Sequence, residues 1–319
     1  MSNLFAQIRD AAAEVARGAQ FVRLQEDRVA PYAASLSVQG LPQPAYDTEH
    51  HFRGSDIDTA AYVLTLDSVN FGSGYFPHLR KREGMSGYFT VATSLTEHWL
   101  DHGPLTPERL QRITPSACAA LFGQSLADPV VTELMRLISQ ALRSLGSWLQ
   151  TYDDDPLAPF AASGGSAAHL IELLTTMPFY QDIARYRDRD VPLYKRAQLL
   201  AADMALAFDE RGPGAFHDLD DLTIFADNLV PHVLRVDGLL DYEPALLARI
   251  NEGQVIATGS PEETEIRAVG LHAVECIATE LRAHGTPVTA RELDYLLWHR
   301  GQAPTYKAQP RHRARSVFY

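Results

Sequence analysis

The chain of 319 residues lacks several segments that identify large protein classes. No apolar run approaches the ~20 residues that a membrane-spanning helix needs, and residues 1–20 show no signal-peptide pattern. The only two cysteines, Cys118 and Cys276, lie in apolar helical contexts, which favours buried thiols over a disulfide or a zinc site. We therefore expect a cytoplasmic protein with no membrane partner.

The motifs of several common enzyme classes are also missing. There is no Walker-type phosphate loop, no G-x-G-x-x-G fingerprint, no H-E-x-x-H zinc motif and no nucleophile elbow. The nearest metal signal is the pair His98 and His102, one helical turn apart, to which His50 or His51 could add a ligand. The same pair also fits an ordinary helix end beside its C-terminal dipole.

Positive charge is scarce. The 28 lysines and arginines are outnumbered by 40 aspartates and glutamates, giving a formal net charge of −12. Proteins that bind polymeric nucleic acid usually present a basic face, because phosphate neutralisation supplies most of the affinity. The only dense basic clusters are residues 78–82 and 311–315, and each suits one small anion. We expect a small-molecule ligand and no direct nucleic-acid partner, and the sequence leaves the oligomeric state open.

The chain does contain apolar residues that recur with helical periodicity. The expected helices cover residues 3–17, 57–71, 129–149, 193–208, 218–226, 228–236, 261–283 and 289–298. Strand signals are few and short, so we predict a mainly α fold. The polar, glycine-rich connection at 153–166 either separates two helical lobes, about 1–152 and 167–319, or is a long loop within one domain. We predict a single domain over residues 1–319, with the two possible lobes around a central active-site cleft.

The most informative stretch is residues 223–232, in which an apolar run precedes Asp227, Asn228 and then Pro231. If Asp227 or Asn228 is the N-cap, Pro231 lies near the end of the first turn, where its missing N–H costs least. Asp227 would then lie at the positive end of a helix dipole, which favours its ionised form. Asp227 is therefore either a reactive carboxylate or only a helix cap.

Other candidates stand in less distinctive contexts. Lys195 falls in the first turn of an amphipathic helix, where a lysine gains nothing from the dipole, and Asp203 is a lone acid within a small and apolar run. Asn70 and Phe71 precede a glycine turn, where an aromatic could stack on a planar base and an amide could bond its edge. Phe71 could equally be core and Asn70 a helix C-cap. Thr289 and Glu292 form a capping box, which leaves Asp294, Tyr295 and Trp298 without an assigned role.

Taken together, these motifs resemble one family, the queuosine salvage proteins, which are queuosine 5′-phosphate N-glycosylases. The matching segments, in family order and nearly from end to end, are residues 66–71, 193–203, 225–231, 293–298 and 312–319. No single segment is specific, but their ordered combination is. One departure is the Gly72-Ser73-Gly74-Tyr75 stretch, which replaces a further aromatic-rich run ending in Trp.

The resemblance implies a helical fold similar to the helix-hairpin-helix DNA glycosylases, in which a Lys and an Asp from neighbouring helices flank the scissile bond. Lys195 and Asp227 match those places. The implied reaction is hydrolysis of queuosine 5′-monophosphate to queuine and ribose 5-phosphate, without metal or organic cofactor. A fixed carboxylate suits this chemistry, because the sugar develops oxocarbenium character and water must be activated.

The same resemblance suggests which residues bind the substrate. The base would be held by Asn70, Phe71 and Asp203, while Asp294 is a candidate for the secondary ammonium of queuine. The phosphate would meet Lys195, with His232 and the tail arginines as further cations. The remaining substrate-binding candidates are His51, Tyr295 and Trp298. Two other functions stay open: a metal-dependent hydrolase using His98 and His102, and a non-catalytic queuine or nucleotide carrier.

Overall fold

The computed structural model of the chain describes residues 3–36 and 44–319. Helices predominate within these residues, which confirms the prediction of a mainly α fold. The helices are α1 (Leu4–Gly18), α2 (Val29–Ser35), α3 (Asp56–Val69), α4 (Gly87–His102), α5 (Pro107–Arg112), α6 (Pro115–Leu121), α7 (Pro129–Gln150), α8 (Ala158–Ala162), α9 (Ala167–Leu174), α10 (Lys195–Ala207), α11 (Val230–Val236), α12 (Pro244–Asn251), α13 (Pro261–Ala283), α14 (Ala290–Arg300) and α15 (Pro304–Lys307). The strands form two antiparallel pairs, β1 (Val22–Leu24) with β4 (Leu240–Tyr242) and β2 (Ile183–Tyr186) with β3 (Arg189–Pro192).

Local signals account for several helix boundaries. Helix α13 begins and ends at the predicted residues, because Ser260 Oγ accepts from Glu263 N and Pro261 occupies the first helical position. The predicted capping box of α14 is confirmed: Thr289 Oγ1 accepts from Glu292 N at 3.2 Å, and Glu292 Oε2 accepts from Thr289 N at 2.8 Å.

The stretch before α11 departs from expectation. The helix predicted over 218–226 is wrong, since only a 3₁₀ turn at Leu219–Asp221 forms there and 222–229 is irregular. Helix α11 begins at Val230, two residues later than expected. Backbone N–H groups of this stretch bond to carboxylate oxygens, and such bonds compete with helix formation. The helix expected over 193–208 likewise begins two residues later, at Lys195, because Pro192 still belongs to strand β3.

The described chain forms two compact units, each built from separate segments. Unit 1 contains residues 1–44, 182–195 and 220–315, and unit 2 contains residues 45–181, 196–219 and 316–319. The polar connection at 153–166 lies inside unit 2. A single domain over residues 1–319 stays a prediction.

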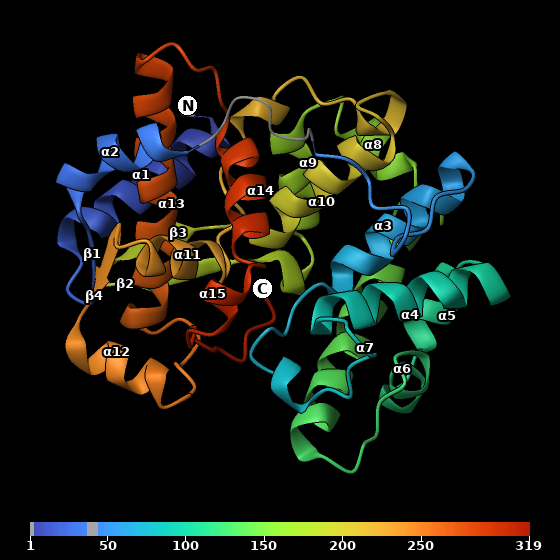
Figure 1. Cartoon of the computed structure of the whole chain (residues 1–319). Coiled ribbons are helices and arrows are strands. Elements are labelled where there is room, and N and C mark those ends of the chain that lie inside the picture. Colours follow the sequence, from blue (N-terminus) through green and yellow to red (C-terminus); the bar gives the residue numbers. More distant parts are fainter. Residues whose placement is uncertain (1–2, 37–43) are drawn as a thin grey trace. The chain divides into compact units, whose positions relative to one another are not determined.

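Unit 1 is organised around α13, the long orange-red helix in Figure 1, against which α1, α2, α11 and α14 pack. Helix α11 approaches α13 closely at Gly270, where an added Cβ would lie only 2.7 Å from Pro231 Cγ. Charged side chains of α13 are also buried, namely Glu263, Glu265 and Arg267. A buried charge needs a partner, so this helix must be held by specific polar contacts as well as by apolar packing.

Unit 2 is organised around α7, which packs against α3, α5 and α6 (Figure 1). The buried Arg196 donates to the carbonyl oxygens of Asp67, Ser68, Phe179 and Val317. Tyr319 is buried, and its carbonyl oxygen accepts from Gly72 N at 2.9 Å. The last four residues are thus tied into the core of this unit.

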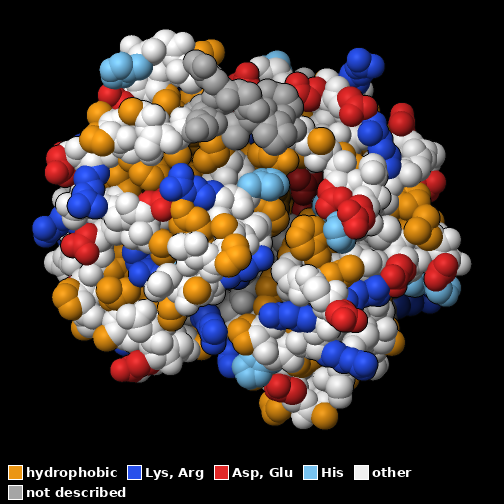
Figure 2. All heavy atoms as spheres, in the orientation of Figure 1, with side chains coloured by type: hydrophobic (Ala, Val, Ile, Leu, Met, Phe, Trp, Pro, Cys, Tyr) orange, Lys and Arg blue, Asp and Glu red, His pale blue; other side chains and the backbone are white. Residues whose placement is uncertain are grey.

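On the face shown in Figure 2, lysine and arginine side chains are scattered among acidic and apolar ones. Both cysteines are free thiols; Cys118 is buried and Cys276 is half-buried. Among the described residues, no helix is long and apolar enough to cross a membrane.

Candidate active site

The loop that carries Asp227 is anchored on both sides of this residue. Asp227 is half-buried, and its Oδ1 accepts from Leu229 N at 2.7 Å and from Val230 N at 3.4 Å. Two residues earlier, Phe225 N donates to Asp294 Oδ1 at 3.0 Å. Asp227 therefore precedes the N-cap residue Leu229 rather than being the N-cap itself. Because backbone donors stabilise the ionised form, its carboxylate is suited to carry negative charge.

Lys195 is the first residue of α10 and is buried, although its helix position favoured a solvated side chain. Its backbone N donates to Asp182 Oδ2 at 3.0 Å, and Asp182 O accepts from Leu193 N and Tyr194 N. Tyr194 has a φ of 46°, a left-handed conformation that a bulky residue rarely adopts. The turn into Lys195 is thus held by a single aspartate.

Asp294 connects the two preceding groups electrostatically. Burial and then the charge of Asp227 raise its pKa, while the Phe225 N–H bond and the charge of Lys195 lower it, and the result is a pKa of about 8. Asp227, Asp294 and Lys195 are therefore near enough to influence one another within unit 1. A buried carboxyl group with a raised pKa beside a second carboxyl group is an arrangement found in acid–base catalysis.

A fourth charged group belongs to this set. Desolvation lowers the pKa of Arg311, and the charge of Asp227 opposes that shift, which places the guanidinium near the carboxylate. The preceding loop is linked to the same tail, since Asn228 Nδ2 donates to His312 O at 3.3 Å. Unit 1 thus brings two carboxyl groups and two cations together.

Unit 2 carries a second set of candidates, which is mostly aromatic. Burial raises the pKa of Tyr88, and the charges of Asp203 and Asp67 raise it further. The pKa of Tyr46 is raised by burial, by Tyr62 and then by the same two aspartates. These tyrosines therefore stay neutral at physiological pH and lie around a pair of acidic residues. Asp67, a residue that the sequence did not single out, is fully buried.

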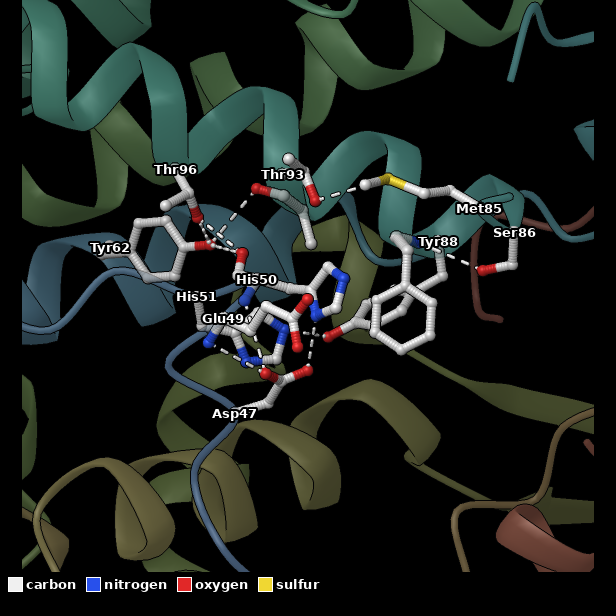
Figure 3. Close-up of polar contacts among 12 residues, drawn as sticks. Asp47, Glu49, His50, His51, Tyr62, Met85, Ser86, Tyr88, Thr93 and Thr96 are labelled. Carbon is white, nitrogen blue, oxygen red and sulfur yellow. Dashed lines mark hydrogen bonds and ion pairs between the residues drawn. The ribbon is translucent and has the colours of Figure 1, made fainter. Parts of the chain in front are cut away.

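His51 belongs to this aromatic set. Its Nε2 lies 2.8 Å from Tyr88 Oη (Figure 3), and its ring packs against Tyr46 at 5.4 Å between centroids. Burial lowers the pKa of His51 to about 4, with Asp47 acting in the opposite direction. The neutral imidazole and the neutral tyrosines offer ring faces and hydrogen-bonding groups rather than positive charge.

Comparison with known proteins places this set of residues in a family. The model of the queuosine salvage protein family matches residues 50–319. The chain belongs to the queuosine salvage protein family. It is 36% identical over 310 residues to the queuosine 5′-phosphate N-glycosylase/hydrolase of Sphaerobacter thermophilus, covering 96% of this chain and 95% of the relative. The protein of the same name from Dictyostelium discoideum is 32% identical over 264 residues, covering 82% of this chain and 78% of the relative.

Within this queuosine salvage chain, Asn70 and Phe71 occupy the positions expected of structural residues. Asn70 is the half-buried C-cap of α3, and Phe71 is only 2% exposed. The ring of Phe71 lies 6.0 Å from that of Phe179 and under the guanidinium of Arg196. These contacts favour the interpretation of Phe71 as a core residue. Stacking of Phe71 on the base stays a prediction that the contacts do not support.

His232 is also held by contacts within unit 1. Its Nε2 lies 2.9 Å from Tyr306 O and its Nδ1 lies 3.2 Å from Arg235 Nη2. Burial lowers the pKa of His232 to about 4, so it is neutral at physiological pH. A neutral imidazole with contacts at both nitrogens cannot offer positive charge to a phosphate. Phosphate binding by His232 therefore stays a prediction that these contacts do not support.

Tyr295 and Trp298 are half-exposed and one turn apart on α14, next to the buried Asp294. Both rings pack against His299, at 4.0 Å and 5.1 Å between centroids. Their exposure is compatible with ligand contact, which stays a prediction.

Among the described residues, no third potential metal ligand groups with His98 and His102. His98 and His102 stack on α4 with their ring centroids 4.8 Å apart. Within residues 3–36 and 44–319, the only group of three potential ligands is Asp47, Glu49 and His50, in which His50 Nδ1 already bonds Asp47 Oδ2 at 2.9 Å.

Four buried charges in unit 1 escaped the sequence analysis: Asp182, Glu263, Glu265 and Arg267. A signal existed for the three on α13, because Glu263, Glu265 and Arg267 alternate along this helix. At 100° per residue, side chains two positions apart point to different sides of a helix. The three charges therefore cannot share one solvated face, and at least one must enter the core.

Proposed function

We propose that this protein hydrolyses the N-glycosidic bond of queuosine 5′-monophosphate and releases queuine and ribose 5-phosphate. Family membership supports the substrate class, since the curated relatives carry the name queuosine 5′-phosphate N-glycosylase/hydrolase. The observation that carries the mechanism is the mutual influence of Asp227, Asp294 and Lys195 within unit 1.

Asp227 is the central group in this proposal. As the glycosidic bond lengthens, the sugar acquires positive charge, and a fixed carboxylate stabilises it without reorganisation. The same carboxylate orients the attacking water and accepts its proton as the C1′–O bond forms. Its backbone hydrogen bonds support this role because they hold one oxygen in place.

Asp294 has a complementary role. The bonding electron pair leaves with the nitrogen of the 7-deazapurine, a poor leaving group that benefits from a proton. A buried carboxyl group whose pKa is raised to about 8 keeps its proton at neutral pH and can donate it. The same property makes Asp294 a weaker receptor for the ammonium of queuine than an ionised carboxylate would be.

The remaining groups bind the substrate. Lys195 and Arg311 supply positive charge for the 5′-phosphate, a role supported by the influence of Lys195 on Asp294 and of Asp227 on Arg311. Asp203 and Asp67 receive the secondary ammonium of queuine, and Tyr46, Tyr88 and His51 contact the base. Aromatic rings and acidic groups together are the usual receptor for an organic cation.

The proposal includes the fold relationship that the resemblance implies, a likeness to helix-hairpin-helix DNA glycosylases. The mainly helical architecture supports it, and so does the position of Lys195 and Asp227 at or just before the first turns of α10 and α11. The proposed substrate is the free nucleotide, because a net charge of −12 disfavours approach of intact tRNA.

Incubation of the purified protein with queuosine 5′-monophosphate, followed by chromatography, tests this function. We expect equal amounts of queuine and ribose 5-phosphate, undiminished by excess EDTA, and no queuine from queuosine-containing tRNA. Activity that EDTA abolishes and zinc restores would instead favour the hydrolase built on His98 and His102. Tight binding of the nucleotide without formation of ribose 5-phosphate would indicate a non-catalytic carrier. Efficient release of queuine from tRNA would overturn the assignment of a free nucleotide as substrate.

A further inference from the structure

The guanidinium of Arg267 makes a two-sided contact inside unit 1. On one side it forms a bidentate pair with Asp182, with Nη1–Oδ1 at 2.9 Å and Nη2–Oδ2 at 2.6 Å. On the other side Nε donates to Ala226 O at 2.8 Å. Both partners of the ion pair are almost completely buried, at 1% and 2% exposure. Such a planar fork fixes the direction of each group that it binds.

Each side of this contact leads to a catalytic candidate. Ala226 is the residue before Asp227, so its carbonyl oxygen fixes the peptide from which the catalytic carboxylate projects. Asp182 bonds the backbone N of Lys195 through Oδ2, the same oxygen that Arg267 holds at 2.6 Å. One guanidinium therefore controls the backbone at both Lys195 and Asp227.

From this arrangement we infer that Arg267, together with Asp182, is a positioning residue that sets Lys195 and Asp227 in register for glycosidic-bond cleavage. The inference rests on the proposed function for its activity readout. It explains why a charged pair is buried where apolar packing would serve stability as well. It also explains how the left-handed Tyr194 persists, since a strained residue survives only where its surroundings determine it.

The test uses three variants and one matched control. Arg267→Gln removes the fork. Asp182→Asn keeps an acceptor for Lys195 N but neutralises the pair. The double variant Asp182→Asn/Arg267→Gln removes both charges of the pair together, and Glu263, whose Oε1 lies 3.7 Å from Arg267 Nη1, loses this cationic partner. The control is Glu265→Gln, two residues away on α13 and fully buried, whose carboxylate accepts from Gln20, Phe21 and Val22 N–H groups instead.

Turnover is the first readout. Misplacement of reacting groups by about 1 Å costs roughly 10²-fold in rate, so we expect kcat to fall about that far in Arg267→Gln and in the double variant. The KM for queuosine 5′-monophosphate should rise less than kcat falls, by no more than the about 10-fold expected when Lys195 loses its contact with the phosphate. Glu265→Gln should lower the melting temperature but keep kcat per folded molecule. If kcat per folded molecule falls no further in Arg267→Gln and the double variant than in Glu265→Gln, the inference is overturned.

Amide hydrogen exchange is the second readout and needs no substrate. We expect protection to fall together at residues 195–198 and 226–230 in the double variant, and at residues 20–22 in Glu265→Gln. Unchanged protection at either of the first two segments would refute a joint positioning role. If the unmodified protein does not cleave the nucleotide, the proposed function fails, and the exchange data still decide whether Arg267 couples the two segments.

Discussion

The two candidate sets differ in how their polar groups are held. In unit 1, Asp227 and Asp182 are fixed by backbone N–H groups, and Arg267 links the segments that carry Asp227 and Lys195. In unit 2, Tyr88 and His51 bond to each other (Figure 3), and the charges of Asp203 and Asp67 act on the buried Tyr88. Rigid charges suit a reaction in which charge develops, whereas aromatic rings suit the recognition of a planar base. The comparison predicts that variants of the unit 1 carboxyl groups change turnover, whereas unit 2 variants change affinity.

The largest expected effect is in Asp227→Asn, which keeps the size of the side chain and an acceptor for Leu229 N. Loss of one preorganised electrostatic contact typically costs about 10²–10³ in rate. We expect kcat to fall by at least that much while nucleotide affinity, measured by calorimetry, is retained. Near-normal turnover in the folded variant would return Asp227 to a purely structural role in the loop.

Asp203→Asn should show the opposite pattern. A hydrogen bond to a charged group contributes about 1.5–3 kcal/mol, so affinity for free queuine should fall roughly 10- to 100-fold. The kcat at saturating nucleotide should stay within a few-fold of the unmodified protein. A large loss of kcat with unchanged queuine affinity would break the distinction between the two units.

Lys195→Met tests whether Lys195 serves the phosphate end of the substrate. Queuine lacks both sugar and phosphate, so a cation that serves the phosphate has no effect on its binding. We expect nucleotide affinity to fall about 10-fold, the usual order for a lost charged contact, while queuine affinity is unchanged. Equal losses for the two ligands would place Lys195 at the base or show that it only supports the fold.

The last expected effect concerns stability rather than activity: Asp294→Asn should change the pH dependence of unfolding. The pKa of Asp294 is about 8 in the folded protein, against about 4 for an unfolded Asp. Between these values the folded protein keeps a proton that the unfolded chain has lost, so this group makes the free energy of unfolding decrease as pH rises. Its contribution is about 1.4 kcal/mol per pH unit.

Denaturant titrations of both proteins between pH 5 and pH 7 measure this slope. The Asn side chain does not titrate, so the variant should lack the contribution, while other titrating groups cancel in the comparison. Identical slopes would show that Asp294 is ionised in the folded protein, which would remove it as the proton donor and restore it as a candidate ammonium receptor.

Prediction from sequence succeeded where local chemistry decides the structure. The boundaries of α13 follow from Ser260, Pro261 and a long helical pattern, and the capping box at Thr289 forms as expected. Prediction failed over residues 218–226, where the apolar run predicts a helix that does not form. There the backbone donors of Phe225 and Leu229 bond to carboxylates, one of which comes from α14. No local pattern reveals an acceptor that is 69 residues away in the chain.

By itself, the sequence determined the mainly α character and the family, and it nominated Asp227 and Lys195 for the proposed chemistry. It did so because helix periodicity, capping and ordered motifs are properties of neighbouring residues. Only the tertiary structure decided that Asp294 is buried beside Asp227, that Phe71 packs in the core and that Arg267 joins two distant segments. Burial and the pairing of charges arise from segments far apart in the chain, so their energies depend on packing that local sequence does not encode.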